Sequence, residues 1–261
     1  MSRISPLFER LRAEERLGLF TYITVGYPEL GSTPDVAVAL AEAGADLIEL
    51  GIPFSDPLAE GRTIQATSQR ALENGVNVAI CLETAWAIRQ RSEVPLVFMG
   101  YLNPILAYGV KRFTEHAADV GVDGLIVVDL SLEETGELRA ACQYAGLDLI
   151  FFVAPTSTEA RMRLVAEQAS GFIYCISVTG VTGSRQEIGA EVESLLGRIR
   201  AMTSTPLAVG FGLSKPEHLR SLRGKVDAAL VGSALLDAIG KGEDDPVGAA
   251  AGFVHWLREG L

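Results

Sequence analysis

Glu49 is the residue of this 261-residue chain whose surroundings point most directly to chemistry. It lies in the apolar run Leu47–Ile52, and side chains of a β-strand alternate between two faces, so Glu49 shares a face with Leu47 and Gly51. The other face is continuously apolar and is expected to pack against helices. Burial of a carboxylate is unfavourable unless it is paired or protonated, and it raises the pKa toward the range of a general acid/base. The sequence therefore predicts either a catalytic acid/base or a structural ion pair at Glu49.

Two further acids, Asp56 and Glu60, follow in a segment whose prolines restrict the backbone. Either could place a second carboxylate opposite Glu49. The alternative for both is an ordinary solvated loop residue.

Glycine-rich segments follow the last three apolar runs of the chain. They are Thr179–Ser184, Gly210–Ser214 and Val231–Leu235. The last one places Gly232 and Ser233 at the start of a helical turn, Ala234–Ile239. Glycines allow close approach of the backbone to a phosphate, and free N–H groups at a helix start complement its charge. Although turns also use glycine, three such segments together predict a phosphate site.

The elements that must position these residues alternate between apolar β-rich runs and helical patterns. The predicted strands are Leu19–Val25, Leu47–Ile52, Leu96–Tyr101, Gly124–Val128, Leu147–Val153, Phe172–Ser177, Leu207–Phe211 and Ala228–Val231. The predicted helices between them are Asp35–Ala43, Val78–Gln90, Lys111–Val120, Ser131–Tyr144, Ser157–Gln168, Glu191–Met202 and Pro216–Leu222. An extra helix, Ile4–Arg12, precedes the first strand, and Val247–Arg258 forms the last helix.

This alternation predicts an α/β fold with parallel strands and helical crossovers. Eight units favour a closed (β/α)8 TIM barrel, one domain over residues 1–261, with an open doubly wound sheet as the alternative. The connections after strands 2 and 6, Pro53–Asn77 and Val178–Ala190, are unusually long. Such loops lie at the C-terminal face of a barrel, where active sites form, although surface loops also tolerate harmless insertions.

Composition excludes several functional classes. The 33 acidic and 22 basic residues give a net charge of −11, which argues against a nucleic-acid partner but allows an anion held by backbone amides. Cys81, Cys142 and Cys175 show neither paired nor metal-ligand spacing, so neither a disulfide framework nor a metal site is expected. No signal peptide or membrane span is evident, which predicts a cytoplasmic protein. Trp86 and Trp256 are expected to be packing residues.

Five segments resemble, in the same order and over essentially the whole chain, the alpha subunit family of tryptophan synthase. They are Glu49–Gly61, Gly100–Leu106, Ser177–Gly183, Val209–Ser214 and Val231–Ala234. The resemblance implies a lyase that splits indole-3-glycerol phosphate into indole and glyceraldehyde 3-phosphate by a retro-aldol reaction. It also implies a beta subunit that contains pyridoxal phosphate and receives the indole in an α2β2 assembly, with no cofactor in this chain.

The same resemblance implies roles for individual residues. Glu49 would be the acid/base, with Glu60 as the second catalytic carboxylate. Tyr22, Ile64 and Tyr174 would surround the substrate, and Thr182 would position the catalytic loop. The phosphate would be bound by Gly183, Phe211, Gly212, Gly232 and Ser233. The partner would dock on Asp56, Pro57, Asn103 and Pro104.

One departure from the family pattern concerns the second carboxylate. The family reads Ala-Asp-Gly-Pro where this chain has Ala59-Glu-Gly-Arg62. The extra methylene of Glu60 displaces its carboxylate by about 1 Å, and misplacement on that scale can lower a rate about 10²-fold. Arg62 could also pair with Glu60. Two hypotheses follow, an active lyase and a catalytically weakened subunit that binds ligand and activates its beta partner. A third is another phosphate-binding barrel enzyme, such as an isomerase.

Overall fold

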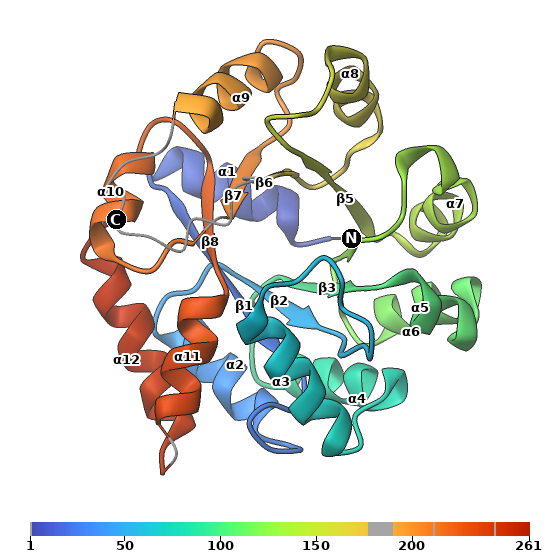
Figure 1. The fold of residues 1–261 in the computed structure, drawn as a ribbon, viewed down its shortest axis with the longest axis vertical. Helices are drawn as coiled ribbons and strands as arrows, with labels where there is room; N and C mark the ends of the chain where they lie inside the picture. Colours follow the sequence, from blue (N-terminus) through green and yellow to red (C-terminus); the bar gives the residue numbers. More distant parts are fainter. Residues whose placement is uncertain (1, 177–189, 211, 243) are drawn as a thin grey trace.

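Eight parallel strands form a closed barrel in the order β1 to β8 (Figure 1). The computed structural model describes residues 2–176, 190–210, 212–242 and 244–261. The strands are β1 (Gly18–Thr24), β2 (Leu47–Gly51), β3 (Leu96–Gly100), β4 (Gly124–Val127), β5 (Asp148–Val153), β6 (Ile173–Ile176), β7 (Leu207–Gly210) and β8 (Ala228–Val231). The predicted barrel and all eight strands are therefore confirmed, and the open sheet is excluded because β1 pairs with β8.

The pleat of β2 places its side chains as the alternation predicts. Leu47 belongs to the apolar cluster inside the barrel, whereas Ile48 and Leu50 belong to the larger cluster between the strands and the helices. The register with β1 sets Glu49 opposite Tyr22. Glu49 therefore points into the barrel interior beside an aromatic side chain.

Helices surround the barrel. The described α-helices are α1 (Ile4–Ala13), α2 (Thr33–Glu42), α3 (Arg62–Glu73), α4 (Val78–Arg89), α5 (Leu102–Tyr108), α6 (Val110–Asp119), α7 (Gly136–Ala145), α8 (Glu159–Gln168), α9 (Ala190–Arg200), α10 (Pro216–Leu222), α11 (Ser233–Lys241) and α12 (Pro246–Arg258). The single helix predicted over Ser131–Tyr144 is instead a 3₁₀ turn, Leu132–Glu134, followed by α7. Trp86 and Trp256, expected to be packing residues, are 54% and 42% exposed, and the Trp256 ring lies 5.7 Å from that of Phe253.

The predicted extra helix α1 covers the end of the barrel that lies behind the plane in Figure 1. Its Phe8 ring lies 5.8 Å from that of Phe20 on β1 and 6.1 Å from that of Phe172. The Phe20 and Phe172 rings are themselves 5.5 Å apart. This aromatic cluster fills the bottom of the barrel, so in the part of the chain that the structure describes the barrel interior is open to a ligand from the opposite end.

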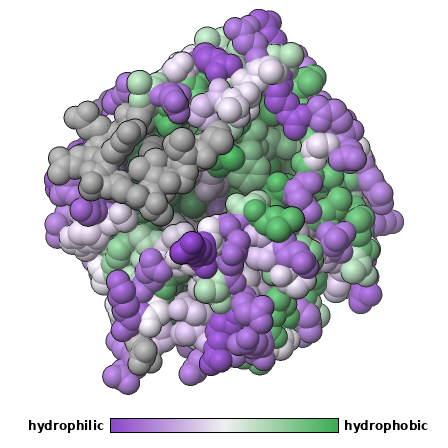
Figure 2. All heavy atoms as spheres, viewed as in Figure 1, coloured by the Kyte–Doolittle hydropathy of each residue, from purple (hydrophilic) through white to green (hydrophobic). Residues whose placement is uncertain are grey.

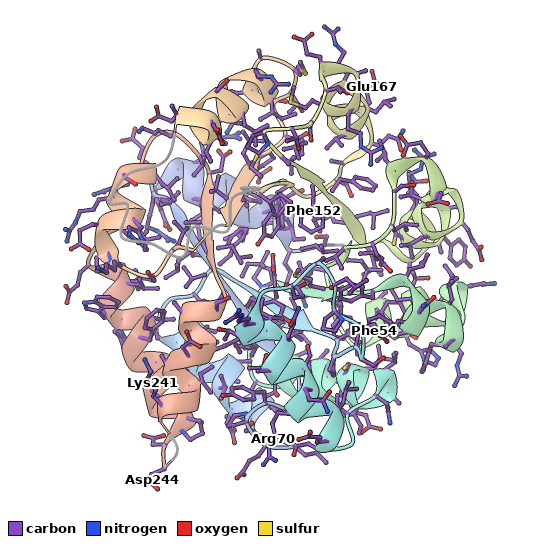
Figure 3. The ribbon with its side chains drawn as sticks, in the orientation of Figure 1. Phe54, Arg70, Phe152, Glu167, Lys241 and Asp244 are labelled. Carbon is purple, nitrogen blue, oxygen red and sulfur yellow. The ribbon has the colours of Figure 1, made fainter. Side chains whose placement is uncertain are left out.

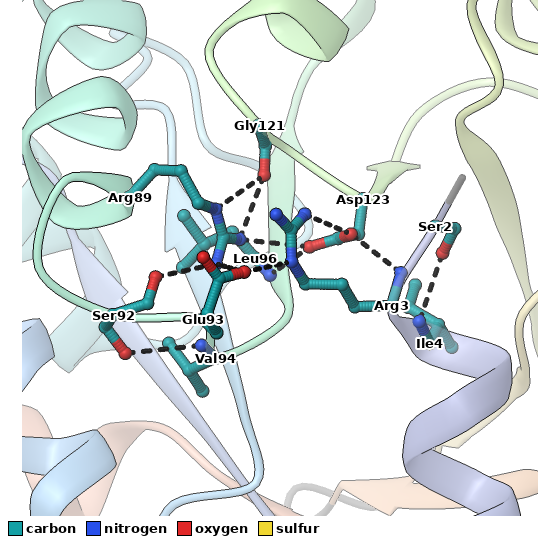
Figure 4. A network of polar contacts seen from close by, with 10 residues as sticks. All are labelled: Ser2, Arg3, Ile4, Arg89, Ser92, Glu93, Val94, Leu96, Gly121 and Asp123. Atoms are coloured by element: carbon teal, nitrogen blue, oxygen red, sulfur yellow. Dashed lines mark hydrogen bonds and ion pairs between the residues drawn. The ribbon is translucent and has the colours of Figure 1, made fainter.

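A polar network fastens α1 and α4 to the same end of the barrel (Figure 4). Asp123, directly before β4, accepts hydrogen bonds from the backbone N–H of Leu96 at 2.9 Å and from the backbone N–H of Arg3 at 2.8 Å. The guanidinium groups of Arg3 and Arg89 lie 3.1 and 3.2 Å from its two oxygens. Both oxygens of this buried carboxylate therefore have hydrogen-bond and ion-pair partners, in contrast to Glu49 at the other end of the barrel.

The long connection after β2 contains a helix that the sequence pattern did not predict. In place of a loop over the whole of Pro53–Asn77, residues 62–73 form α3. Its buried residues are small or polar, Thr67, Ser68 and Ala71, so the chain lacks an apolar stripe there. Thr67 forms a buried hydrogen bond of 2.8 Å with Thr24 of β1, which holds α3 against the barrel. Most of the second long connection, Val178–Ala190, lies outside the described residues.

None of the helices in the described part of the chain combines the length and apolar character that a membrane crossing requires.

Candidate active site

A pocket of about 330 Å³ opens at the C-terminal end of the barrel. Figure 2 shows this face, where apolar surface lies along one side of a hollow near the middle. Eight of the predicted site residues line the pocket: Tyr22, Glu49, Glu60, Ile64, Tyr174, Gly212, Gly232 and Ser233. Thr182, Gly183 and Phe211 lie outside the described residues. Gly210, Leu213, Ser214 and Ala234, which also line the pocket, lie in the glycine-rich segments that predicted a phosphate site. The sequence did not single out Met99, Leu230 and Asp237, which complete the lining.

Glu49 is fully buried, and no described residue offers a hydrogen bond to either of its carboxylate oxygens. A structural ion pair, the alternative that the sequence left open, is therefore absent from the described structure. Burial raises the pKa of Glu49 well above its usual value, and the nearby charge of Glu60 raises it further. Both the burial and the neighbouring carboxylate therefore favour the protonated form of Glu49.

Glu60 is the second carboxylate of the pocket. Burial raises its pKa to about 7, so it is partly ionised at neutral pH. Arg62 is exposed at the start of α3, and no ion pair joins these two described residues, so the structure does not contain the pair that Arg62 could have formed with Glu60. Asp56, the other loop acid, is exposed and accepts a hydrogen bond of 2.6 Å from Ser55. Of the two loop acids, only Glu60 faces Glu49 across the pocket.

We predict that Glu60 makes the stability of the protein depend on pH. Its pKa is about 7 in the folded chain and near the ordinary 4.5 in the unfolded chain, so unfolding releases a proton between these values. The free energy of unfolding should therefore fall as pH rises from 4.5 to 7, with a contribution of the order of 2 kcal/mol from Glu60. Denaturant titrations at pH 5 and pH 8 should show a smaller difference for Glu60→Gln than for wild type. An equal or larger difference in the variant would contradict this assignment.

Contacts with Tyr101 and Gln65 fix the loop that carries Glu60. The backbone N–H of Ala59 donates to the Tyr101 hydroxyl at 3.0 Å, and the Phe54 ring stacks on the Tyr101 ring at 5.0 Å. The side chain of Gln65 donates to the Glu60 carbonyl at 2.9 Å. Figure 3 shows Phe54 on this loop, on the side of the barrel mouth nearest α5. The carboxylate of Glu60 is therefore presented by an anchored loop.

The opposite wall of the pocket suits a phosphate group. Gly232 and Ser233 stand at the N-terminus of α11, and Gly212 follows β7 with a φ of +55° that favours glycine. The described residues that line the pocket include no lysine, arginine or histidine. An anion at this wall would meet backbone N–H groups, the Ser233 hydroxyl and the positive end of the α11 dipole.

Two tyrosines of the pocket each lie against a glycine at the end of a strand. A Cβ atom added to Gly51 would lie 2.1 Å from the Tyr22 hydroxyl, and one added to Gly210 would lie 2.3 Å from the Tyr174 hydroxyl. Both tyrosines are buried, and the Phe152 ring, near the centre of Figure 3, lies 5.0 Å from that of Tyr174. The two glycines thus make room for the rings that shape the cavity.

We predict that Gly210→Ala lowers catalytic activity about tenfold and destabilises the fold by about 1–3 kcal/mol, because the added methyl overpacks the site and pushes the Tyr174 ring. Tyr174→Phe removes the hydroxyl and leaves ring carbons at 2.9 Å as the nearest atoms. The double variant should therefore recover part of the lost activity and stability relative to Gly210→Ala alone. Steady-state kinetics and thermal unfolding measure both effects. Strictly additive losses would show that the methyl group acts elsewhere.

The residues expected at a partner interface lie outside the pocket, on two segments joined through Tyr101. Asp56 and Pro57 belong to the loop that contacts Tyr101, while Asn103 and Pro104 lie in the first turn of α5 directly after it. Two leucines of the same segments, Leu58 and Leu106, are 90% and 50% exposed. The sequence analysis did not single out these two leucines. Leu58 was the available signal, because a large apolar residue in an exposed loop indicates a surface for binding another protein.

Comparisons with known proteins extend over the whole chain. The family model described as "Tryptophan synthase alpha chain" matches residues 8–255. The tryptophan synthase alpha chain of Roseiflexus castenholzii is 50% identical over 99% of this chain and 100% of its own length. That of a Thermoanaerobacter species is 44% identical over the full length of both chains.

Solved structures give the same result. A crystal structure of tryptophan synthase subunit alpha from Legionella pneumophila has a TM-score of 0.93 at 34% identity, covering 100% of this chain and 98% of the other. A structure of Mycobacterium tuberculosis tryptophan synthase has a TM-score of 0.93 at 36% identity, with 100% and 98% covered. At these identities the similarity extends beyond the barrel fold to the family.

Proposed function

The chain belongs to the tryptophan synthase alpha chain family, and we propose on that premise that Glu49 and Glu60 carry out its reaction. As an alpha chain it is a lyase of tryptophan biosynthesis that cleaves indole-3-glycerol phosphate into indole and glyceraldehyde 3-phosphate. The observation that supports the residue assignment is the fully buried carboxyl of Glu49, which has no described hydrogen-bond partner and shares a pocket with Glu60.

The reaction needs two proton transfers, and Glu49 can perform both. Its protonated carboxyl gives a proton to ring carbon C3, which leaves the indole ring positively charged. The resulting carboxylate then removes the proton of the adjacent glycerol hydroxyl. As the aldehyde forms, the carbon–carbon bond breaks and its electron pair returns to the ring, which releases neutral indole.

Glu60 would stabilise the charged intermediate. Because it faces Glu49 across the pocket, its carboxylate can lie near the ring nitrogen that carries the positive charge. Tyr22, Ile64 and Tyr174 would enclose the indole, with Thr182 positioning the loop. Gly183, Phe211, Gly212, Gly232 and Ser233 would bind the phosphate. Proton transfer by side chains needs no cofactor, so we assign none to this chain.

An alpha chain has a beta subunit as its partner. We propose an α2β2 assembly in which the beta subunit carries pyridoxal phosphate and docks on Asp56, Pro57, Asn103 and Pro104. The exposed Leu58, which directly follows Asp56 and Pro57, supports that surface, because docking would bury it. We further propose that residues 1–261 act as one domain in the cytoplasm.

The direct test is incubation of the protein with indole-3-glycerol phosphate, alone and with a beta subunit. We expect indole and glyceraldehyde 3-phosphate in equal amounts in both cases. Binding without product, together with activation of the beta subunit, would instead support the weakened regulatory subunit. Failure of the substrate to bind would favour another phosphate-binding barrel enzyme.

A further inference from the structure

A hydrogen bond connects the two walls of the pocket at its rim. The Thr63 hydroxyl on α3 donates to the Asp237 carboxylate on α11 at 3.2 Å, although the two residues are 174 positions apart. Asp237 itself lines the pocket. Neither residue has a place in the reaction described above.

Thr63 belongs to the turn that follows Glu60. It is the second residue of α3, and the next residue, Ile64, lines the pocket. Gln65 of the same turn holds the carbonyl of Glu60 at 2.9 Å. A shift of this turn would therefore displace the backbone from which the Glu60 side chain extends.

Asp237 anchors that turn through its hydrogen bond with Thr63. It lies four residues after Ser233 on α11, so the two side chains share the helix face that borders the pocket. The opposite face of α11 is buried through Leu235, Leu236 and Ile239, which holds the helix in place. A phosphate bound at the start of α11 would lie within about 10 Å of the Asp237 carboxylate, close enough for charge repulsion to reach it.

We propose that Asp237 is a positioning and specificity-determining residue, which aligns Glu60 through Thr63 and weakens the binding of phosphate dianions. The proposal rests on the proposed function. It predicts that the two effects separate, because an asparagine keeps the hydrogen-bond acceptor but loses the charge.

Kinetics of four variants test the positioning effect. Thr63→Val and Asp237→Ala should each lower kcat about fivefold, the loss expected for one exposed hydrogen bond to a charged group. Because both remove the same bond, the double variant should lose no more than either single one. Asp237→Asn should recover at least half of the wild-type kcat. Losses that multiply in the double variant, or a kcat within twofold of wild type for both single variants, would overturn the positioning role.

Calorimetry with glycerol 3-phosphate tests the charge effect without turnover. Asp237→Asn and Asp237→Ala should bind it about fivefold more tightly at low salt, and the gain should shrink as salt is added. Thr63→Val should bind it like wild type. Asp244→Asn removes the same charge beyond the far end of α11 (Figure 3) and serves as the matched control. Equal gains in Asp244→Asn, or no gain in the Asp237 variants, would overturn the charge effect.

The two experiments also separate this proposal from the proposed function. If the wild-type protein released no indole, the proposed function would fail, whereas the binding pattern would still decide the effect of the Asp237 charge. If wild type turned over normally and the Thr63 and Asp237 variants matched it in kcat and in affinity, the role of Asp237 would be overturned and the proposed function would stand. Thermal unfolding of each variant confirms that it folds.

Discussion

Replacement of Glu49 by glutamine is expected to lower indole formation about 10³-fold while leaving the affinity for glycerol 3-phosphate within about twofold of wild type. Glutamine has nearly the same shape but can neither give nor accept the proton. The carboxyl lies inside the barrel on β2, whereas the proposed phosphate wall is formed by Gly212, Gly232 and Ser233. The change therefore removes the chemistry and leaves the binding surface intact.

Single-turnover kinetics with saturating indole-3-glycerol phosphate would measure the loss directly, and calorimetry would measure the binding. Glu49→Gln should fold at least as well as wild type, because neither oxygen of Glu49 has a described partner to lose. The matched control is Asp56→Asn, which neutralises an exposed carboxylate outside the pocket. A Glu49→Gln variant that retained full turnover would end the assignment of Glu49 as the acid/base.

Much of this architecture follows from local patterns. Parallel strands buried on both faces appear as short apolar runs, so all eight strands were predicted with ends within two residues of those observed. The inward direction of Glu49 follows from the period of two along β2. Because the barrel is closed, this inward-pointing carboxyl is fully buried.

The remaining features depend on tertiary contacts that no local pattern shows. Residues 62–73 lack an apolar stripe, because α3 packs through Thr67, Ser68 and Ala71. Arg62 was expected beside Glu60, but the helix starts at Arg62 and leaves its side chain in solvent. Asp237 is an ordinary polar residue in the sequence, and only the fold brings it to Thr63.

The second change for which we expect a large loss of activity is a shorter side chain at Glu60. We expect Glu60→Asp to lower kcat about tenfold to 10²-fold, although aspartate is the residue found at this position in the family pattern. The backbone on either side is held by the Ala59–Tyr101 and Gln65–Glu60 hydrogen bonds, so the loop cannot readily advance to compensate for a lost methylene. Glu60→Gln should lose about 10²-fold, since it keeps the length but removes the charge that stabilises the ring cation.

Arg62→Ala is the control for the altered loop. Its exposed side chain forms no ion pair with Glu60 in the described structure, so the variant should turn over within about twofold of wild type. Rates for the three variants, measured with and without a beta subunit, distinguish the two hypotheses for this chain. If Glu60→Asp gained activity strongly, Glu60 would be a poorly placed carboxylate and the chain a weakened catalyst. A loss in Glu60→Asp with an unchanged Arg62→Ala would instead show that this pocket is built around the longer acid.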